Sequence, residues 1–252
     1  MAGNNNNRKR NVVRSASTRP TGFYWILGII VIAGASILGY TLLRKPSAPV
    51  GTEIKFDPAT AGPAQGYSMG KADAPVEIVE FADFECPGCG GFATVTEPDV
   101  RKRIIEPGLA KITFFDFPLP QHKNSQGAHN AAACAGDQGK FWEMHDRLFG
   151  MQDQWNTEAT DNPKPFFEKY AQDIGLDTKA WEACYDARKH QGRIMANLAE
   201  GERRQVGSTP TFFIGNKMYP GSLPYDVMKA IVDSAAKKPA VADSAAKKPA
   251  AQ

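Results

Sequence analysis

Short apolar runs along the chain predict its strands. APVEIVEFADF, residues 74–84, is rich in β-branched side chains and ends at a cysteine–proline pair, which is typical of a strand. KITFFDFPL, residues 111–119, predicts a second strand on the same grounds. TPTFFIGNKMYP, residues 209–220, contains two such runs around a Gly-Asn pair and predicts a β-hairpin.

Helical patterns occupy the segments between and after these strands. A helix is expected to open at Cys86, with Pro87 in its first turn, where a missing N–H leaves no bond unmade. Pro98 is expected to bend or end that helix. The segment from about 125 to 205 is predicted to be helical.

Capping signals divide the helical part further. Gly175 marks a stop, and Asp177 or Thr178 marks a new start. In LPYDVMKAIVDSAA, a last helix is expected to be capped by Ser222 and started by Pro224. The predicted order is therefore β-α-β, a long helical insertion, and then β-β-α, which is the thioredoxin topology with a helical domain inserted.

A run without charge, FYWILGIIVIAGASILGYTLL, fills residues 23–43. As a helix it would extend roughly 31 Å, about the thickness of the bilayer core. Basic residues are more numerous before this run than directly after it, which predicts a cytoplasmic N-terminus and an exported domain. A cleaved signal peptide is the alternative, since Ala33-Gly34-Ala35 resembles a processing site. The apolar run continues to Leu43, so an uncleaved transmembrane anchor is favoured.

Three further segments carry no core pattern. A disordered, basic, cytoplasmic segment is expected at 1–22, a flexible linker rich in Pro, Gly and Ala at 44–68, and a low-complexity tail at 233–252. The tail repeats DSAAKKPAVA as DSAAKKPAAQ; weak contact with cell wall or anionic lipid is the alternative to a solvated tail. The folded domain is therefore expected at 69–232.

The charge of the chain is unevenly placed. The formal net charge is +3, yet the basic excess belongs to the terminal segments and residues 46–232 carry −6. An acidic domain gives no support to nucleic-acid binding.

Two of the four cysteines have the spacing that thiol–disulfide exchange needs. Cys86 lies at a helix start, where free N–H groups and the helix dipole lower the pKa of a thiol below roughly 8.5. Cys89 follows one turn later on the same face and can close a disulfide with it. We expect Cys86 to be the nucleophile and Cys89 to be the buried resolving thiol. Outside the cytoplasm such a bond persists.

Two other uses of a C-x-x-C pair were weighed. A structural zinc site needs about four ligands, and neither the other cysteines nor the histidines stand at ligand spacing: Cys134, Cys184, His122, His129, His145 and His190. His145 falls on an apolar helix face, which favours a core histidine. A purely structural 86–89 disulfide would close a very small loop and stabilise little. We therefore expect no metal, and no cofactor other than the cysteine pair itself.

Three motifs carry a family resemblance. VEFADFECPGC, DQGKFWEMHDRLF and VGSTPTFFIGN resemble, in matching order over about residues 67–232, the DsbA-like thiol:disulfide oxidoreductases of the thioredoxin superfamily. C-x-x-C alone is a moderate signal, but STPT about 120 residues later makes it a strong one. The resemblance implies a thioredoxin-like α/β fold and a redox-active centre.

The resemblance also implies roles for single residues. Pro210 would be a cis-proline beside the redox cysteines, and the backbone of Thr209 would pair with the substrate chain. A cis X-Pro bond lies only about 0.5–1 kcal/mol above trans; an ordinary trans proline at a strand start is the alternative. Pro87 and Gly88, between the cysteines, complete the expected substrate-binding set.

Glu80 matches a buried acidic position of the family that moves protons for the inner thiol. Within the apolar run VEIVEF a carboxyl group is expected to be desolvated and its pKa raised, which suits a proton acceptor for Cys89. The alternative is a solvent-facing glutamate on an edge strand.

The remaining cysteines lie on two different predicted helices. Some family members have a second cysteine pair in the insertion, which implies that Cys134 and Cys184 form a structural disulfide. Such a bond would close a loop of about 50 residues and stabilise the insertion by roughly 4 kcal/mol in the chain-entropy model. Two buried free thiols, or a redox relay to the active site, are the alternatives.

Three residues near the cysteines depart from the strongly oxidising family pattern. Gly88 stands where the best-known strong oxidant has histidine. Asp83 and Glu85 add negative charge, which is expected to destabilise the Cys86 thiolate and make a milder oxidant.

The sequence thus predicts a membrane-anchored, extracytoplasmic thiol:disulfide oxidoreductase, in the inner membrane with its catalytic domain periplasmic. Its expected reaction is the oxidation of cysteine pairs in exported proteins, with reoxidation by a quinone-linked membrane partner. A reductase or isomerase fed by a membrane electron donor is one alternative, and an exported metal-binding chaperone is another. A monomer is favoured.

Overall fold

The computed structural model describes residues 21–43, 52–53 and 64–237, which belong to two units, Met1–Pro46 and Ser47–Gln252. The first unit contains helix α1 (Thr21–Leu43). Side chains are described for residues 24–40 of α1, and among the residues so described no helix is long and apolar enough to cross a membrane. The span expected over 23–43 is therefore not found in the described part of the chain.

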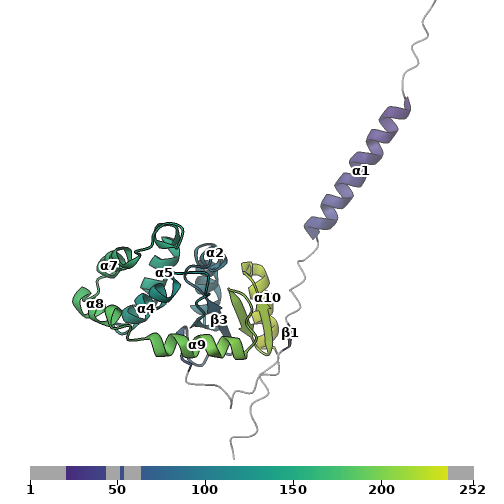
Figure 1. The fold of residues 1–252 in the computed structure, drawn as a ribbon. Helices are drawn as coiled ribbons and strands as arrows, with labels where there is room; N and C mark the ends of the chain where they lie inside the picture. The colour runs from purple at the N-terminus through teal and green to yellow at the C-terminus, as the bar shows by residue number, and fades with distance from the viewer. Residues whose placement is uncertain (1–20, 44–51, 54–63, 238–252) are drawn as a thin grey trace, which may run out of the picture. The chain divides into compact units, whose positions relative to one another are not determined.

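The second unit is built on a mixed six-stranded sheet in the order β1-β6-β5-β3-β4-β2 (Figure 1). The central strand β3 runs parallel to β4 and antiparallel to β5, and β5 continues into β6 through the Gly215-Asn216 turn. Both edge strands are antiparallel additions to this frame. The bounds of the strands are β1 Thr52–Glu53, β2 Tyr67–Met69, β3 Glu77–Ala82, β4 Lys111–Asp116, β5 Thr211–Ile214 and β6 Lys217–Pro220.

The chain that follows β3 is helical from Pro87 to Ile105, and two of its turns have π-helical hydrogen bonding. It passes through α2 (Pro87–Gly91), the π-helical turn η2 (Phe92–Thr96), α3 (Glu97–Val100) and a second π-helical turn, η3 (Arg101–Ile105). Pro98 has no N–H to donate, so the helix widens to an i to i+5 bond from Glu97 N–H to the Phe92 carbonyl just before it. The expected break at Pro98 is thus a widened turn within a continuing helix.

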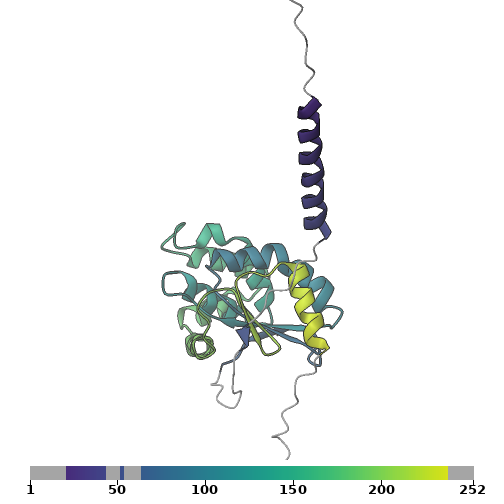
Figure 2. The same cartoon turned by 90° about the vertical axis from the view of Figure 1, so that its right-hand side faces the viewer.

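Six helices form the insertion between β4 and β5, as expected for 125–205, and the last helix of the described residues follows β6. Figure 1 shows α4, α5, α7 and α8 grouped on one side of the sheet, and Figure 2 shows α10, in yellow, beside the strands of the C-terminal hairpin. Asp177 caps α8 by accepting bonds from the N–H groups of Lys179 and Ala180, as predicted. The bounds are α4 Ser125–Gly136, α5 Phe141–Gly150, α6 Gln152–Trp155, α7 Lys164–Asp173, α8 Thr178–Asp186, α9 Gln191–Arg203 and α10 Tyr225–Ala236.

Three boundaries differ from their predictions. The body of the domain begins before residue 69, because Gln65 is held by Asn197 and Tyr67–Met69 is strand β2; three residues are too few to show a period. Helix α10 extends past residue 232 to Ala236, so the tail begins later than predicted. The N-cap of α10 is Pro224 and not Ser222. The expected features at 1–20, in most of 44–68 and at 238–252 lie outside the described residues.

Alternation along the strands explains how the sheet is covered. Successive side chains point to opposite faces, and on one face of β3 lie Ile78, Glu80 and Ala82, while Phe81 points to the other. On its face of the sheet, Phe81 forms a buried apolar cluster with Phe117, Val206 and Phe213. The Ile78 face carries two larger clusters, one packed by α10 and one shared with the insertion. Cys86 and Cys89 belong to the cluster shared with the insertion.

Candidate active site

Cys86 is placed at the junction of β3 and α2. It is the N-cap residue of α2 with an extended backbone, and Pro87 occupies the first turn as predicted. The Cys86 Sγ lies 3.4 Å from the carbonyl oxygen of Thr209. Cys86 and Cys89 are not bonded to each other, so the structure represents the reduced pair.

The environment of Cys86 favours its thiolate. Its pKa is lowered to about 5, first because the Cys89 thiol donates a hydrogen bond to it, and against the raising effect of burial. The Thr209 side chain and the N–H groups of Cys89 and Gly88 lower the pKa further. The Thr209 Oγ1 is buried and has no hydrogen-bond partner among the described residues.

Cys89 has the opposite character. Its side chain is fully buried, and burial is the main cause that raises the pKa of its thiol well above the usual range. The hydrogen bond to Cys86 and the charges of Cys86 and Glu80 raise it further. Cys89 is thus the more deeply buried of the two thiols, and the roles of nucleophile and resolving thiol stay predictions.

The loop before β5 faces the cysteines across the start of α2. The Thr209–Pro210 peptide bond is cis, as the resemblance implies. A β-carbon on Gly88 would lie 3.4 Å from Pro210 Cδ and 3.7 Å from Cys86 Sγ, which is ordinary contact. Packing therefore does not require glycine at position 88, and a side chain there would lie over both the proline and the thiol.

Glu80 lies in the apolar face of β3 between Ile78 and Ala82. It is 2% exposed, which excludes the alternative of a solvent-facing glutamate. Burial is the main cause that raises its pKa well above the usual range; Glu97 raises it further and Arg101 opposes both. Its Oε2 has no hydrogen-bond partner among the described residues. Burial therefore favours the neutral, protonated form of this carboxyl group.

A polar cluster beyond Glu80 was not predicted as a unit. Glu97 and His145 are buried, with Glu97 Oε2 3.7 Å from His145 Nε2. Arg101 joins Glu97 at 2.9 Å to Asp146 at 2.7 Å, and Asp146 is 53% exposed. The cluster thus runs from the neighbourhood of Glu80 to the surface. No local spacing signals it, because its members come from two helices that are far apart in sequence.

Asp83 and Glu85, which flank the cysteines in sequence, bind groups that follow β4 and groups of the insertion. Both are buried, and neither is among the main causes of the Cys86 pKa shift. The Asp83 carboxylate accepts bonds from Ser125 Oγ at 2.5 Å and from Leu119 N–H at 2.8 Å. The Glu85 carboxylate accepts the N–H groups of Asn124 and Thr157. These acids fasten the loop before the cysteines to the insertion, and their predicted effect on the Cys86 thiolate stays a prediction.

Gln152 is a second residue that the sequence did not reveal. Its Nε2 donates to the Phe84 carbonyl at 2.7 Å and to the Cys86 carbonyl at 3.0 Å. A β-carbon on Gly90 would approach Gln152 Oε1 to 2.9 Å, so Gly90 allows this close packing. Gly91, by contrast, has open space beside it.

These observations together have a counterpart among known proteins. A family model described as thioredoxin matches residues 64–234. The chain belongs to the thioredoxin family. Like the chain, the solved structure of oxidised BdbD from Bacillus subtilis has this fold; it superposes with a TM-score of 0.60 at 22% identity, over 69% of this chain and 97% of that one.

Two relatives of this thioredoxin-family chain have names that describe different functions. A probable disulfide bond formation protein D of Bacillus anthracis is 26% identical over 179 residues, which are 68% of this chain and 78% of that protein. A Na(+)/H(+) antiporter, NhaA 3 of Salinispora tropica, is 33% identical over 174 residues, 69% of this chain. The match spans only 25% of the antiporter.

The second cysteine pair of this thioredoxin-family domain lies in the insertion. Cys134 on α4 and Cys184 on α8 form a disulfide with a sequence separation of 50 residues. The predicted pairing is confirmed, and the alternative of two free thiols is excluded for this state. A ring nitrogen of His190 lies within 4.8 Å of both sulfurs, which makes these three residues a group able to hold a metal ion if the sulfurs were reduced.

Proposed function

We propose that this chain is a thiol:disulfide oxidoreductase that introduces disulfide bonds into exported proteins through the Cys86–Cys89 pair. One observation carries the proposal: Cys86, with its pKa lowered to about 5, faces a cis-Thr209–Pro210 loop while Cys89 is buried behind it. A stabilised thiolate beside a more deeply buried partner thiol is the arrangement that disulfide exchange requires. The name of the Bacillus anthracis relative supports the same activity.

The reaction begins with the pair in its disulfide form. A substrate thiolate attacks the Cys86 Sγ, the Cys86–Cys89 bond breaks, and its electron pair moves to the Cys89 sulfur. That sulfur takes a proton from Glu80, whose pKa is raised by burial. A second substrate thiolate then attacks the substrate sulfur of the mixed disulfide, and Cys86 leaves as a thiolate. The substrate loses two electrons and the enzyme gains them.

The direction of electron flow follows from the stability of the leaving thiolate. A reduced form stabilised by a low pKa raises the reduction potential of a dithiol pair and makes it an oxidant. The pKa of about 5 at Cys86 therefore favours oxidation of substrates over reduction or isomerisation.

Substrate would be held by the loop opposite the cysteines. The Thr209 carbonyl oxygen lies 3.4 Å from the Cys86 sulfur, and Gly88 lies beside both. We propose that an extended substrate segment pairs with the backbone of Thr209. This contact brings a substrate sulfur to Cys86 without requiring a particular substrate side chain.

The setting of the reaction is also part of the proposal. The apolar run at 23–43 and the basic residues before it support an uncleaved anchor with the catalytic domain outside the cytoplasm. A monomer in that place would need a membrane partner, expected to be quinone-linked, that accepts its two electrons. Fractionation of cells, followed by protease treatment of intact spheroplasts, tests both placement and orientation. A full-length chain that stays soluble in the cytoplasm would contradict them.

Trapping in cells tests the activity directly. Cys89→Ser leaves Cys86 as an attacking thiolate with no resolving partner, so it should accumulate mixed disulfides with exported proteins. Cys86→Ser/Cys89→Ser is the matched control and should trap none. Incubation of the oxidised protein with a reduced, unfolded secreted protein should then produce disulfides in one equivalent. Absence of both trapped partners and disulfide transfer would refute the function, and reduction of substrate disulfides by the reduced protein alone would reverse its direction.

A further inference from the structure

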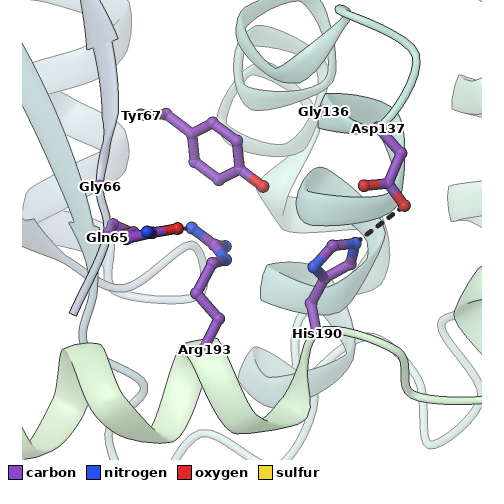
Figure 3. Close-up of a pocket in the computed structure, with 7 residues that line it drawn as sticks. All are labelled: Gln65, Gly66, Tyr67, Gly136, Asp137, His190 and Arg193. Carbon is purple, nitrogen blue, oxygen red and sulfur yellow. Dashed lines mark hydrogen bonds and ion pairs between the residues drawn. The ribbon is translucent and has the colours of Figure 1, made fainter. Parts of the chain in front are cut away.

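The disulfide of the insertion lies beside two further side chains that bind metal ions in proteins. Cys134 Sγ, Cys184 Sγ and a ring nitrogen of His190 all lie within 4.8 Å of one another. Asp137 completes the group, with its Oδ2 3.0 Å from His190 Nε2 and 3.6 Å from Cys184 Sγ (Figure 3 shows the Asp137–His190 pair). Three helices supply the group: Cys134 belongs to α4, Asp137 is its C-cap, Cys184 belongs to α8, and His190 is the N-cap of α9.

The four side chains match the ligands that zinc prefers. Structural zinc is bound tetrahedrally by cysteine sulfur, histidine nitrogen and carboxylate oxygen, with bonds of about 2.0–2.3 Å. Neighbouring ligand atoms in such a tetrahedron lie about 3.3–3.8 Å apart, and Asp137 Oδ2 lies 3.0 Å from His190 Nε2 and 3.6 Å from Cys184 Sγ. In the disulfide the two sulfurs share a covalent bond and cannot both bind as thiolates. Reduction of that bond is therefore required before the site can form.

We propose that reduction of the Cys134–Cys184 disulfide creates a zinc site formed by Cys134, Cys184, His190 and Asp137. A dithiol supplies the electrons. One of its thiolates attacks the partly exposed Cys184 sulfur, Cys134 leaves as a thiolate, and the second thiol of the reductant resolves the mixed disulfide. The reductant becomes a disulfide, the protein gains two electrons, and Zn²⁺ replaces the protons of the two cysteine thiols without changing its own oxidation state.

The surroundings suit such an ion in two respects. Two thiolates and a carboxylate around Zn²⁺ leave one net negative charge, and Lys189 Nζ, 2.8 Å from Asp137 Oδ2, compensates it. A cavity of about 480 Å³ next to the group gives a path for entry, and its lining includes Asp137 and His190 (Figure 3). The bound ion would hold α4, α8 and α9 together in the reduced chain, where the disulfide otherwise joins the first two. The insertion would thus have two interchangeable cross-links, one for each redox state.

The proposal is independent of the chemistry at the active site. Cys86→Ser/Cys89→Ser removes the other thiols that could bind zinc and also abolishes disulfide exchange. All metal measurements are made in this full-length background. Their outcome therefore says nothing for or against the proposed oxidoreductase activity.

Metal titration before and after reduction tests the site. The protein is reduced with a phosphine, freed of reductant without air, and titrated with Zn²⁺ in competition with a chromophoric chelator. We expect one tightly bound equivalent after reduction and none before. Co²⁺ in place of Zn²⁺ should give the intense visible bands of tetrahedral thiolate coordination. A reduced, folded protein that binds no zinc overturns the proposal. If the reduced protein unfolds, zinc must restore its circular dichroism, and failure to do so overturns it equally.

Variants assign the ligands. His190→Ala and Asp137→Asn should each weaken zinc binding by at least about tenfold, and Cys134→Ser/Cys184→Ser should abolish it. His122→Ala, which removes a histidine outside the group, is the matched control and should leave the affinity unchanged. Equal zinc binding in the Cys134→Ser/Cys184→Ser variant would place the ion elsewhere and refute the site.

Discussion

The two cysteine pairs of this domain contain the same atoms but differ in what surrounds them. Cys86 and Cys89 are one helical turn apart, and N–H groups at the helix start point at one sulfur while burial keeps the other neutral. Cys134 and Cys184 are separated by 50 residues and join the last turn of α4 to the last turn of α8. The comparison shows how backbone position separates the two pairs: the helix start favours a thiolate at Cys86, whereas two cysteines on separate helices form a cross-link.

The largest expected effect separates the pairs by activity. Cys86→Ser should reduce the rate of disulfide transfer by about 10³-fold or more, the order expected when a covalent nucleophile is removed. Cys134→Ser/Cys184→Ser should keep most of that rate, because neither residue contributes to the pKa shift of Cys86. Stopped-flow measurement with a reduced peptide substrate compares them. A collapse of activity in the second variant, with the fold intact, would favour the redox relay instead.

Stability should separate the pairs in the opposite sense. Cys134→Ala/Cys184→Ala removes a cross-link over 50 residues and should lower the free energy of unfolding by about 4 kcal/mol in the chain-entropy model. Cys86→Ala/Cys89→Ala removes only a very small loop and should change much less by the same argument. Urea unfolding of the oxidised proteins, followed by tryptophan fluorescence, gives both values. Equal losses of unfolding free energy in the two variants would contradict the view that only the Cys134–Cys184 bond is a structural cross-link.

Glu80 also distinguishes the two pairs. It is proposed to transfer protons for Cys89, and no residue has that proposed role for Cys134 or Cys184. Glu80→Gln keeps the shape and the hydrogen-bonding groups but cannot transfer a proton, so transfer through Cys89 should slow by about 10²-fold. Stability should not fall, since the variant replaces a buried carboxyl group that has an unpartnered oxygen. A loss of rate together with an equal loss of stability would indicate a structural role only. Glu77→Gln, exposed on the same strand, is the matched control.

The pH dependence of the reduced pair tests its asymmetry. The pKa of Cys86 is lowered in the folded state to about 5, against roughly 8.5 in an unfolded chain. A depressed pKa stabilises the folded, reduced protein fully above the unfolded value, and that contribution is lost as the pH falls towards 5. We therefore expect thiolate absorbance to titrate near pH 5, and the reduced protein to lose stability between about pH 8.5 and 5 relative to Cys86→Ser. A titration near 8.5 would remove the basis of the proposed direction.

Most of the fold could be predicted because its signals are local. Each of these signals is contained in a short segment of sequence. Examples are the apolar runs at β3, β4 and the C-terminal hairpin, the helix start at Pro87 and the cap at Asp177. The strand β2 gave no such signal, since three residues pair with β4 only because the fold brings them there. The expected membrane span is not found in the described part of the chain, although its composition is unmistakably apolar.

Several residues of the site reach it through tertiary contacts, which the spacing of residues in the sequence does not reveal. The cysteines and the cis-proline follow from a motif, and the burial of Glu80 follows from its apolar neighbours. Gln152 and the cluster of Glu97 and His145 reach the site from other helices, so no pattern near the cysteines revealed them. The bonds of Asp83 and Glu85 to the insertion are hidden from the sequence for the same reason. Adjacency in sequence suggested an action on Cys86, whereas their carboxylates point to the insertion.

The smallest expected effect concerns these acids and decides between the two interpretations. Glu85→Gln removes a negative charge one residue from Cys86; a brake on the thiolate would then be released and the pKa of Cys86 would fall further. The structure predicts no change in that pKa, because Glu85 is not among its main causes. It predicts instead a stability loss of about 1–3 kcal/mol, since one of the two N–H groups that Glu85 binds would face an amide donor. Glu158 is exposed and lies directly after Thr157. Glu158→Gln should therefore change neither the pKa of Cys86 nor the stability. Thiolate titration and urea unfolding of the three proteins therefore separate an electrostatic neighbour of the redox pair from an anchor that holds its loop.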